Sequence, residues 1–256
     1  MDDLVTLLPP LEDLARRAGA VIMEIYGTDF VARAKADASP VTEADERAEA
    51  IILPELARLA PGIAIVSEEA SAAGHTPDID GAQPFWLVDP LDGTKEFVKR
   101  NGDFTVNIGL IIGGSPALGV VLAPARGLLW SGAGRGTASA VDAHGSRRAI
   151  ACRPRPARGA VVVTSRSHNN PAALAAWMAA FPEATLDFAG SSLKFCKVAE
   201  GSADFYPRFG PTCEWDTAAG HAVLLAAGGH IETFGGKPLA YAKPGFLNPD
   251  FLACGG

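Results

Sequence analysis

Long hydrophobic runs are absent from this chain, and no stretch approaches the ~20 apolar residues that a membrane-spanning helix needs. The first residues, Met1-Asp2-Asp3-Leu4, lack the basic region and the apolar core of a signal peptide. The sequence therefore predicts a cytoplasmic protein without a transmembrane segment. It leaves open a peripheral association with the inner face of the cell membrane.

Cysteine is scarce as well. The four cysteines are scattered along the chain, form no C-x-x-C pair and have no histidine at metal-ligand spacing; they are Cys152, Cys196, Cys213 and Cys254. A disulfide framework and a zinc site are therefore not expected, and reduced thiols are the favoured interpretation.

Basic residues are outnumbered. The chain has 22 Lys and Arg against 29 Asp and Glu, which gives a formal net charge of −7. A protein that binds the nucleic-acid backbone would need a basic face, so this class is not expected. An acidic protein can still bind a small anionic substrate if bound cations reverse the local field.

Two familiar catalytic and nucleotide-binding patterns are also missing. No G-x-S-x-G occurs, so no serine is favoured as a nucleophile. The glycine-rich run Gly132-Ala133-Gly134-Arg135-Gly136 does not fit G-x-G-x-x-G and predicts a hairpin turn instead.

The hydrophobic pattern predicts two unequal halves. Apolar residues recur at helical spacing from Leu11 to Ile25 and again from Ala48 to Leu59, and the texture turns β-rich from 63 to 131. The proline-spaced segment Cys152–Gly159 is the best linker candidate. Strands and helices then alternate as far as a helix over Thr217–Ala227. We expect an α+β half over 1–150 and an α/β half over 151–256, together a layered sandwich.

The most informative segment follows the apolar stretch Phe85–Val88. It reads Asp89-Pro90-Leu91-Asp92-Gly93-Thr94 and carries two carboxylates three residues apart. Both carboxylates and the Leu91 carbonyl can converge on one point, because the proline and the glycine restrict the turn between them. Such hard oxygen ligands suit Mg²⁺. Taken alone, the segment could also be an ordinary turn that ends a strand.

Two further acidic sites favour the metal interpretation. Glu68 and Glu69 end a short β-like run, and Asp216 opens an Ala-rich helix. Singly, Glu68 could be a solvated loop acid and Asp216 a helix N-cap. Together with Asp89 they supply carboxylates from distant parts of the chain, as in a two-metal phosphatase site.

These motifs resemble those of the inositol monophosphatase superfamily of Mg²⁺-dependent, lithium-sensitive phosphatases, with agreement from about Asp37 to Gly229. Three segments are most similar to the 3'(2'),5'-bisphosphate nucleotidase branch: Lys95-Glu96-Phe97, Gly190-Ser191-Ser192-Leu193-Lys194-Phe195 and Tyr206-Pro207-Arg208-Phe209-Gly210-Pro211. The resemblance implies an inositol monophosphatase / fructose-1,6-bisphosphatase-like fold and two or three Mg²⁺ ions per site.

The resemblance also implies residue roles. Metal ligands would be Glu68, Asp89, the Leu91 carbonyl, Asp92 and Asp216, with Asp89 bridging two ions. Catalytic residues would be Glu68, Thr94 and Asp45, where Asp45 ends the loop pattern D-x-S-P-V-T-x-x-D and acts with Thr94 on the attacking water. As structure alone, Asp45 could be a routine acid in the first turn of a helix.

The expected substrate contacts are Glu68, Leu91, Asp92, Gly93, Thr94, Ser191, Lys194, Arg208 and Asp216. Backbone amides of Gly93 and Thr94 would hold the phosphate that is cleaved, and Lys194 and Arg208 a second phosphate. His168 would lie near the base. Lysine and arginine are usually solvated surface charges, and this alternative remains for both cations.

The implied activity is removal of the 3'-phosphate from 3'-phosphoadenosine 5'-phosphate, which gives AMP. Inositol monophosphate or a sugar bisphosphate could undergo the same chemistry. An alternative from another class is a phosphate-sensing module that has lost catalysis. The partner would be a small nucleotide and not a nucleic acid, and the family often forms homodimers.

Overall fold

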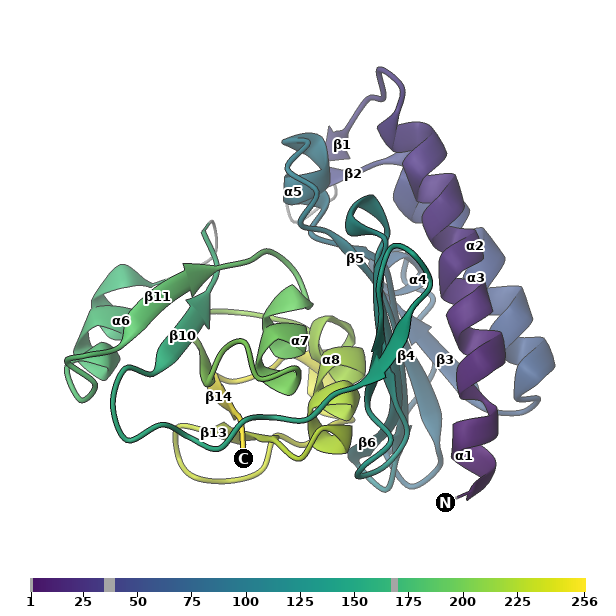
Figure 1. Cartoon of the computed structure of the whole chain (residues 1–256). Coiled ribbons are helices and arrows are strands. Elements are labelled where there is room, and N and C mark those ends of the chain that lie inside the picture. Colours follow the sequence, from purple (N-terminus) through teal and green to yellow (C-terminus); the bar gives the residue numbers. More distant parts are fainter. Residues whose placement is uncertain (1, 35–39, 167–169) are drawn as a thin grey trace.

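The computed structural model describes residues 2–34, 40–166 and 170–256. Two large β-sheets alternate with layers of helices (Figure 1). The larger sheet has seven strands in the order β3-β4-β5-β6-β7-β8-β9. These strands are β3 (Ala64–Ser67), β4 (Phe85–Asp92), β5 (Thr105–Ile112), β6 (Ser115–Ala123), β7 (Leu128–Gly132), β8 (Ser139–Val141) and β9 (Arg147–Ala149). Only β3 and β4 pair in parallel within this sheet.

Two long amphipathic helices cover one face of this sheet (Figure 1). They are α2 (Leu8–Tyr26) and α3 (Glu43–Leu59), preceded by α1 (Asp2–Thr6). Apolar side chains one turn apart, such as Leu11 and Leu14 on α2 and Ile52 and Leu56 on α3, are fully buried against the strands. Helix α2 begins at Leu8, earlier than the predicted start at Leu11. Pro9 and Pro10 are tolerated there because a backbone N–H in the first turn has no acceptor within the helix.

Helix α8 (Glu214–Ala226) covers the opposite face through a stripe of glycines. Gly109 on β5 pairs with Gly119 on β6, which pairs with Gly132 on β7. A Cβ at Gly119 would lie 2.3 Å from the Ala219 carbonyl oxygen, and one at Gly132 would lie 2.5 Å from the Ala226 Cβ. The three glycines in register therefore form a groove into which the Ala-rich helix fits.

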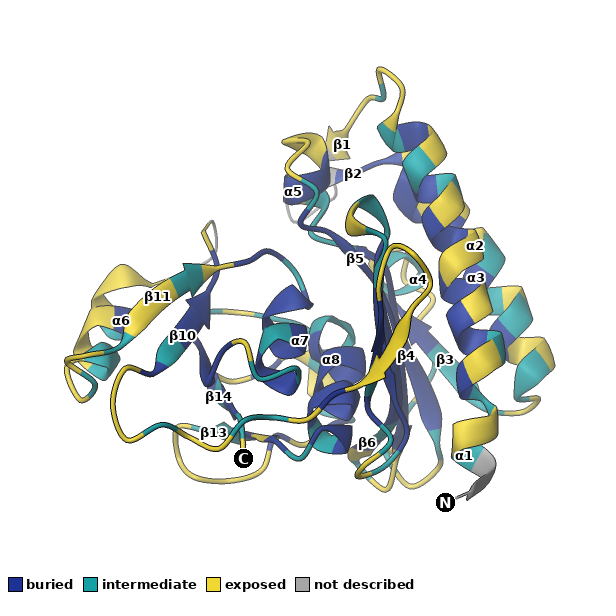
Figure 2. Cartoon of the chain, in the orientation of Figure 1, coloured by how far each residue is buried: buried dark blue, intermediate teal, exposed yellow. Residues whose placement is uncertain are grey.

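The smaller sheet has five strands in the order β11-β10-β12-β14-β13. Helices α7 and α8 lie between the two sheets and are almost entirely buried, as Figure 2 shows in dark blue. Helix α6 packs on the outer face, where Trp177 and Phe181 contact Phe205. The elements of this part are β10 (Val161–Thr164), α6 (Pro171–Met178), β11 (Thr185–Phe188), α7 (Leu193–Ala199), β12 (Phe205–Arg208), β13 (His230–Thr233) and β14 (Phe251–Cys254).

Short elements complete the described chain. They are β1 (Arg33–Ala34), β2 (Pro40–Val41), α4 (Glu68–Ala72), α5 (Thr94–Val98) and two 3₁₀ turns, η1 (Pro124–Arg126) and η2 (Pro244–Phe246). The expected layered α+β / α/β sandwich is confirmed. Gly132–Gly136 joins the antiparallel strands β7 and β8, so the predicted hairpin turn is correct. No helix in the described ranges has the length and apolarity to cross a bilayer.

The predicted linker lies between β9 and β10 and has no regular structure. The boundary after residue 150 therefore falls between the two sheets, and we retain the division into halves 1–150 and 151–256 as a proposal. One difference from the sequence prediction concerns α8, which begins at Glu214 and not at Thr217. The earlier start follows from Asp216, whose carboxylate accepts a hydrogen bond from the Cys213 N–H.

Candidate active site

Parallel pairing of β3 and β4 brings the first two acids together. Ser67 lies opposite Val88 in this register, so Glu68 and Asp89 follow at the same edge of the sheet. Side chains at the carboxyl ends of neighbouring parallel strands converge at that edge. Two acids 21 positions apart in sequence thus become neighbours in the fold.

A β-bulge turns the next carboxylate toward the same place. Asp89 lies opposite Asn107 and Asp92 opposite Thr105, so β4 has one more residue than β5 between these pairs. Gly93 then adopts a left-handed conformation, with φ of 89°, which glycine allows without strain. Asp89 Oδ1 accepts the Leu91 N–H at 3.0 Å, which fixes the turn.

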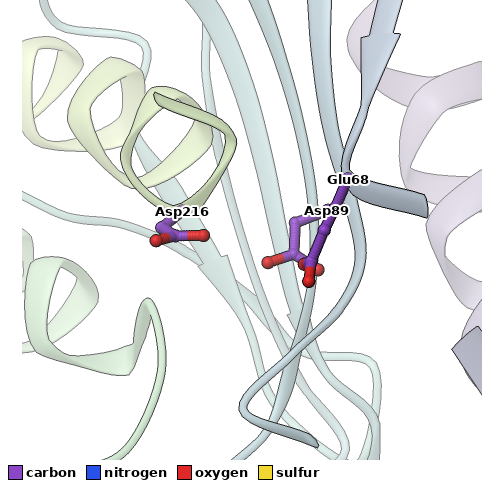
Figure 3. A group of neighbouring side chains, drawn as sticks. All are labelled: Glu68, Asp89 and Asp216. Atoms are coloured by element: carbon purple, nitrogen blue, oxygen red, sulfur yellow. The ribbon is translucent and has the colours of Figure 1, made fainter. Parts of the chain in front are cut away.

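The third acid comes from the other half of the chain. Asp216 lies in the first turn of α8, which the glycine stripe holds against β5 and β6. One carboxylate oxygen from each of Glu68, Asp89 and Asp216 lies within 4.8 Å of the others. Figure 3 shows Glu68 and Asp89 beside each other and Asp216 directed toward them from the helix. Three carboxylates at this spacing fit a cation with hard oxygen ligands.

Asp92 is held by side chains from both halves. Its Oδ2 accepts hydrogen bonds from Ser191 Oγ at 2.8 Å, Ser192 Oγ at 3.2 Å and Asn107 Nδ2 at 3.3 Å. Ser192 Oγ also lies 2.9 Å from the Asp216 carbonyl oxygen, and its one hydroxyl hydrogen is shared between the two acceptors, so one serine contacts both acidic segments. With one oxygen fully engaged, Asp92 has a defined orientation toward the site.

The negative charges of these acids repel one another. Burial and the neighbouring carboxylates of Glu68, Asp92 and Asp216 raise the pKa of Asp89 well above its usual range. Burial, Asp92 and Glu68 raise the pKa of Asp216 in the same direction. Like charges brought together away from water disfavour the ionised forms unless a cation neutralises them. The donor set therefore fits a bound divalent cation.

Asp45 and Thr94 are directly linked. Thr94 Oγ1 lies 3.2 Å from both Asp45 Oδ1 and the Leu91 carbonyl. Asp45 is buried, and its Oδ2 accepts the Thr42 N–H at 2.8 Å. The acid is therefore fixed by its own helix terminus while it orients the Thr94 hydroxyl.

A cavity of about 420 Å³ is lined by the acids. Among the residues that line it are all the predicted metal and substrate residues, namely Glu68, Asp89, Leu91, Asp92, Gly93, Thr94, Ser191, Lys194, Arg208 and Asp216, while Asp45 lies behind Thr94. His168 lies outside the described residues.

Two buried cations face this cavity. Lys194 and Arg208 are only 4% and 9% exposed, which is unusual for these residue types. The Lys194 ammonium donates to the Ser191 carbonyl and lies 5.2 Å from the centre of the Tyr206 ring. Arg208 Nη2 donates to the Pro211 carbonyl at 2.8 Å. The alternative of solvated surface charges is therefore wrong for both.

Sequence reasoning missed a row of polar residues that begins just before β5 and continues along it. Asp103, Thr105 and Asn107 alternate with Phe104 and Val106, and all five are buried. Thr105 contacts the Ser191 hydroxyl, and Asn107 contacts Asp92. The signal was present in the sequence, since polar residues at every second position of a strand share one face.

Comparison with known proteins agrees with this geometry. Residues 3–252 match the model of the Inositol monophosphatase family. The chain belongs to this family. Its members depend on metal ions for catalysis.

Relatives in the inositol monophosphatase family cover nearly the whole chain. A 3'(2'),5'-bisphosphate nucleotidase CysQ of Shigella flexneri is 50% identical over 250 residues, which are 96% of this chain and 98% of the relative. CysQ of Escherichia coli K12 is 49% identical with the same coverage. The crystal structure of CysQ from Bacteroides thetaiotaomicron superposes with a TM-score of 0.79 at 36% identity, over 95% of this chain and 94% of that one.

Proposed function

We propose that this protein hydrolyses the 3'-phosphate of 3'-phosphoadenosine 5'-phosphate to give AMP and phosphate. The main support is a single cavity that is lined both by clustered carboxylates and by two buried cations, Lys194 and Arg208. Carboxylates that bind metal ions suit a phosphate that is cleaved, and buried cations in the same cavity suit a second phosphate that is not cleaved. The nucleotidase names of relatives that are about half identical support the same substrate.

The residues proposed to hold two or three Mg²⁺ ions are Glu68, Asp89, the Leu91 carbonyl, Asp92 and Asp216, with Asp89 shared. Bound Mg²⁺ would acidify a water molecule and neutralise the charge that develops on the phosphate and leaving oxygen. All these ligands are oxygens, which Mg²⁺ prefers to the nitrogen and sulfur ligands typical of zinc.

Thr94 and Asp45 are proposed to orient the attacking water. When the Thr94 hydroxyl donates its hydrogen to Asp45, its oxygen is left to accept a hydrogen bond from that water. Glu68 lines the same cavity and is proposed to take part by helping to hold the ion that acidifies this water. The backbone N–H groups of Gly93 and Thr94, in the turn after β4, would hold the phosphate that is cleaved.

Lys194 and Arg208 are proposed to bind the phosphate that is not cleaved, with Ser191 beside them. A charge-assisted hydrogen bond contributes roughly 1.5–3 kcal/mol. Loss of either cation should therefore lower kcat/KM about ten- to a hundredfold for a substrate with this second phosphate. For a monophosphate, the same substitutions should change kcat/KM little.

The test compares hydrolysis of 3'-phosphoadenosine 5'-phosphate, inositol 1-phosphate and fructose 1,6-bisphosphate by the wild type, Lys194→Ala and Arg208→Ala. We expect the wild type to prefer the nucleotide and both variants to lose that preference. Preference for either sugar-derived ester would contradict the proposed substrate. Turnover at background with Mg²⁺ present would favour a phosphate-sensing module instead. The cytoplasmic location and the homodimer remain predictions.

A further inference from the structure

Asp103 is a buried carboxylate outside the set of residues assigned above. Its side chain is 1% exposed and accepts hydrogen bonds from three donors in different parts of the chain. Arg126 donates to Oδ1, while Arg166 Nη1 and the Gly190 N–H donate to Oδ2 at 2.7 and 3.1 Å. Burial raises the pKa of Asp103, but the donated hydrogen bonds and the arginine charges outweigh it, so the pKa lies below the usual range.

These contacts hold the segment that leads into Ser191. Gly190 precedes Ser191 directly, and its N–H is bound to Asp103. Arg166, the partner of the same carboxylate, also donates Nη2 to the Phe188 carbonyl at 3.3 Å. Residues 188–190 are therefore tied to Asp103 at two points, once directly and once through Arg166.

The backbone of Asp103 packs between two loops of the site. A Cβ on Gly190 would lie 2.5 Å from the Asp103 carbonyl oxygen, and one on Gly93 would lie 3.1 Å from the same atom. The loop with the proposed phosphate-binding amides and the loop that leads into Lys194 thus meet at one residue. A shift of Asp103 would move them relative to each other.

Ser191 is the link from Asp103 to the substrate cation. It has a φ of 52°, a left-handed conformation that is uncommon for a residue other than glycine. Such a conformation persists only where surrounding contacts hold it. The Lys194 ammonium donates to the Ser191 carbonyl, so the position of Ser191 also sets the position of the ammonium.

We propose that Asp103 is a positioning residue for the phosphate that is not cleaved. It contacts none of the proposed metal ligands through its carboxylate and does not line the cavity. It acts by holding Gly190 and Ser191 so that Lys194 presents its ammonium to the substrate. The identity of that second phosphate rests on the proposed function, whereas the loop geometry does not.

The matched test compares Asp103→Asn with Asp204→Asn. Asp204 has the same chemistry: it is buried and accepts hydrogen bonds from Arg153 and from the Val161 N–H, yet it does not line the cavity. In Asp103→Asn one carboxylate oxygen is replaced by an NH₂ group, which cannot accept a hydrogen bond from the N–H donor that faces it. We expect its KM for 3'-phosphoadenosine 5'-phosphate to rise about ten- to a hundredfold. Its kcat should stay within about threefold.

Hydrogen exchange at the Gly190 amide provides a readout that needs no substrate. Exchange should become faster in Asp103→Asn and stay at the wild-type rate in Asp204→Asn. Unchanged exchange and KM in Asp103→Asn would overturn the proposal, as would an equal rise in KM in both variants. If Asp103→Asn does not fold, Arg166→Gln removes the half-exposed guanidinium and should give a smaller rise in KM. A wild type inactive on the nucleotide would refute the proposed substrate, while the exchange experiment would still test Asp103.

Discussion

Asp45 and Asp216 occupy the same position, the third residue, in helices α3 and α8. Each accepts a hydrogen bond through Oδ2 from the backbone N–H of its N-cap residue, Asp45 from Thr42 at 2.8 Å and Asp216 from Cys213 at 2.7 Å. The structural interpretation of these acids as helix-terminus residues and the catalytic interpretation are therefore compatible. One oxygen stabilises the helix start while the other is left for the site.

Removal of the Thr94–Asp45 pair should affect turnover more than binding. Thr94→Ala and Asp45→Asn should lower kcat on the order of 10²–10³ with little change in KM, because the pair acts on the water and not on the substrate. Steady-state kinetics at saturating Mg²⁺ measure this. Thr94→Ser keeps the hydroxyl and serves as the control. A rise in KM at constant kcat would show that the water-orienting role is wrong.

Asp89 and Asp216 should respond differently to added Mg²⁺. Asp89→Asn should abolish activity at every Mg²⁺ concentration, because Asp89 is proposed to bridge two ions. Asp216→Asn should mainly weaken binding of one ion, so that higher Mg²⁺ restores part of the rate. Rates across a Mg²⁺ titration, with binding measured by calorimetry, test both. Rescue of Asp89→Asn to near the wild-type rate would exclude a bridging role.

The burial of Lys194 predicts a pH dependence of substrate choice. Burial lowers the pKa of Lys194 to about 8, although Asp92 partly opposes this shift. The ammonium should therefore lose its charge as pH rises from 7 to 9. The ratio of kcat/KM for the bisphosphate to that for a monophosphate should fall with it, by about tenfold per pH unit above the pKa. In Lys194→Arg the ratio should be independent of pH in this range. A constant ratio in the wild type would contradict this assignment.

His221 should make the fold less stable in acid. It is buried, its Nδ1 lies 3.0 Å from the Tyr241 hydroxyl, and burial together with His230 lowers its pKa to about 3. An unfolded histidine titrates near 6.5. The stability due to neutral His221 is therefore complete above about pH 6.5 and is lost as pH falls toward 3, by roughly 1.4 kcal/mol per pH unit.

Urea unfolding of the wild type and His221→Gln between pH 7 and 4.5 measures this contribution. The variant should show the smaller fall in free energy of unfolding over that range, whatever its stability at pH 7. His144→Gln, in an exposed turn, is the control and should keep the wild-type slope. Equal slopes in wild type and His221→Gln would refute the prediction.

The acids of the site could be predicted because they lie in short contiguous motifs. Asp89 and Asp92 are fixed by the proline and glycine between and after them, and this geometry is local. Asp45 was assigned through family resemblance, since its helix-terminal position alone fits a structural role equally well. The burial of Lys194 and Arg208 depends on tertiary packing and could not be predicted from neighbouring residues.

Longer-range features needed the structure. The three glycines at 109, 119 and 132 form a stripe only because the register of β5, β6 and β7 aligns them, and this register is not visible in the sequence. The polar row that begins at Asp103 was missed because its alternation was interpreted as loose strand patterning. Its partners, Gly190 and Asp92, lie in other parts of the chain.

Glu68 and Asp89 come from the chain before residue 150, whereas Asp216 comes after it and reaches them only when α8 lies on the glycine stripe. An ion bound by all three would therefore cross-link distant parts of the chain. Its binding would add to the free energy of unfolding. Above its dissociation constant, each tenfold rise in free ion concentration should add about 1.4 kcal/mol to the free energy of unfolding. The concentration of free divalent cation would then affect the stability of the fold as well as the activity of the site.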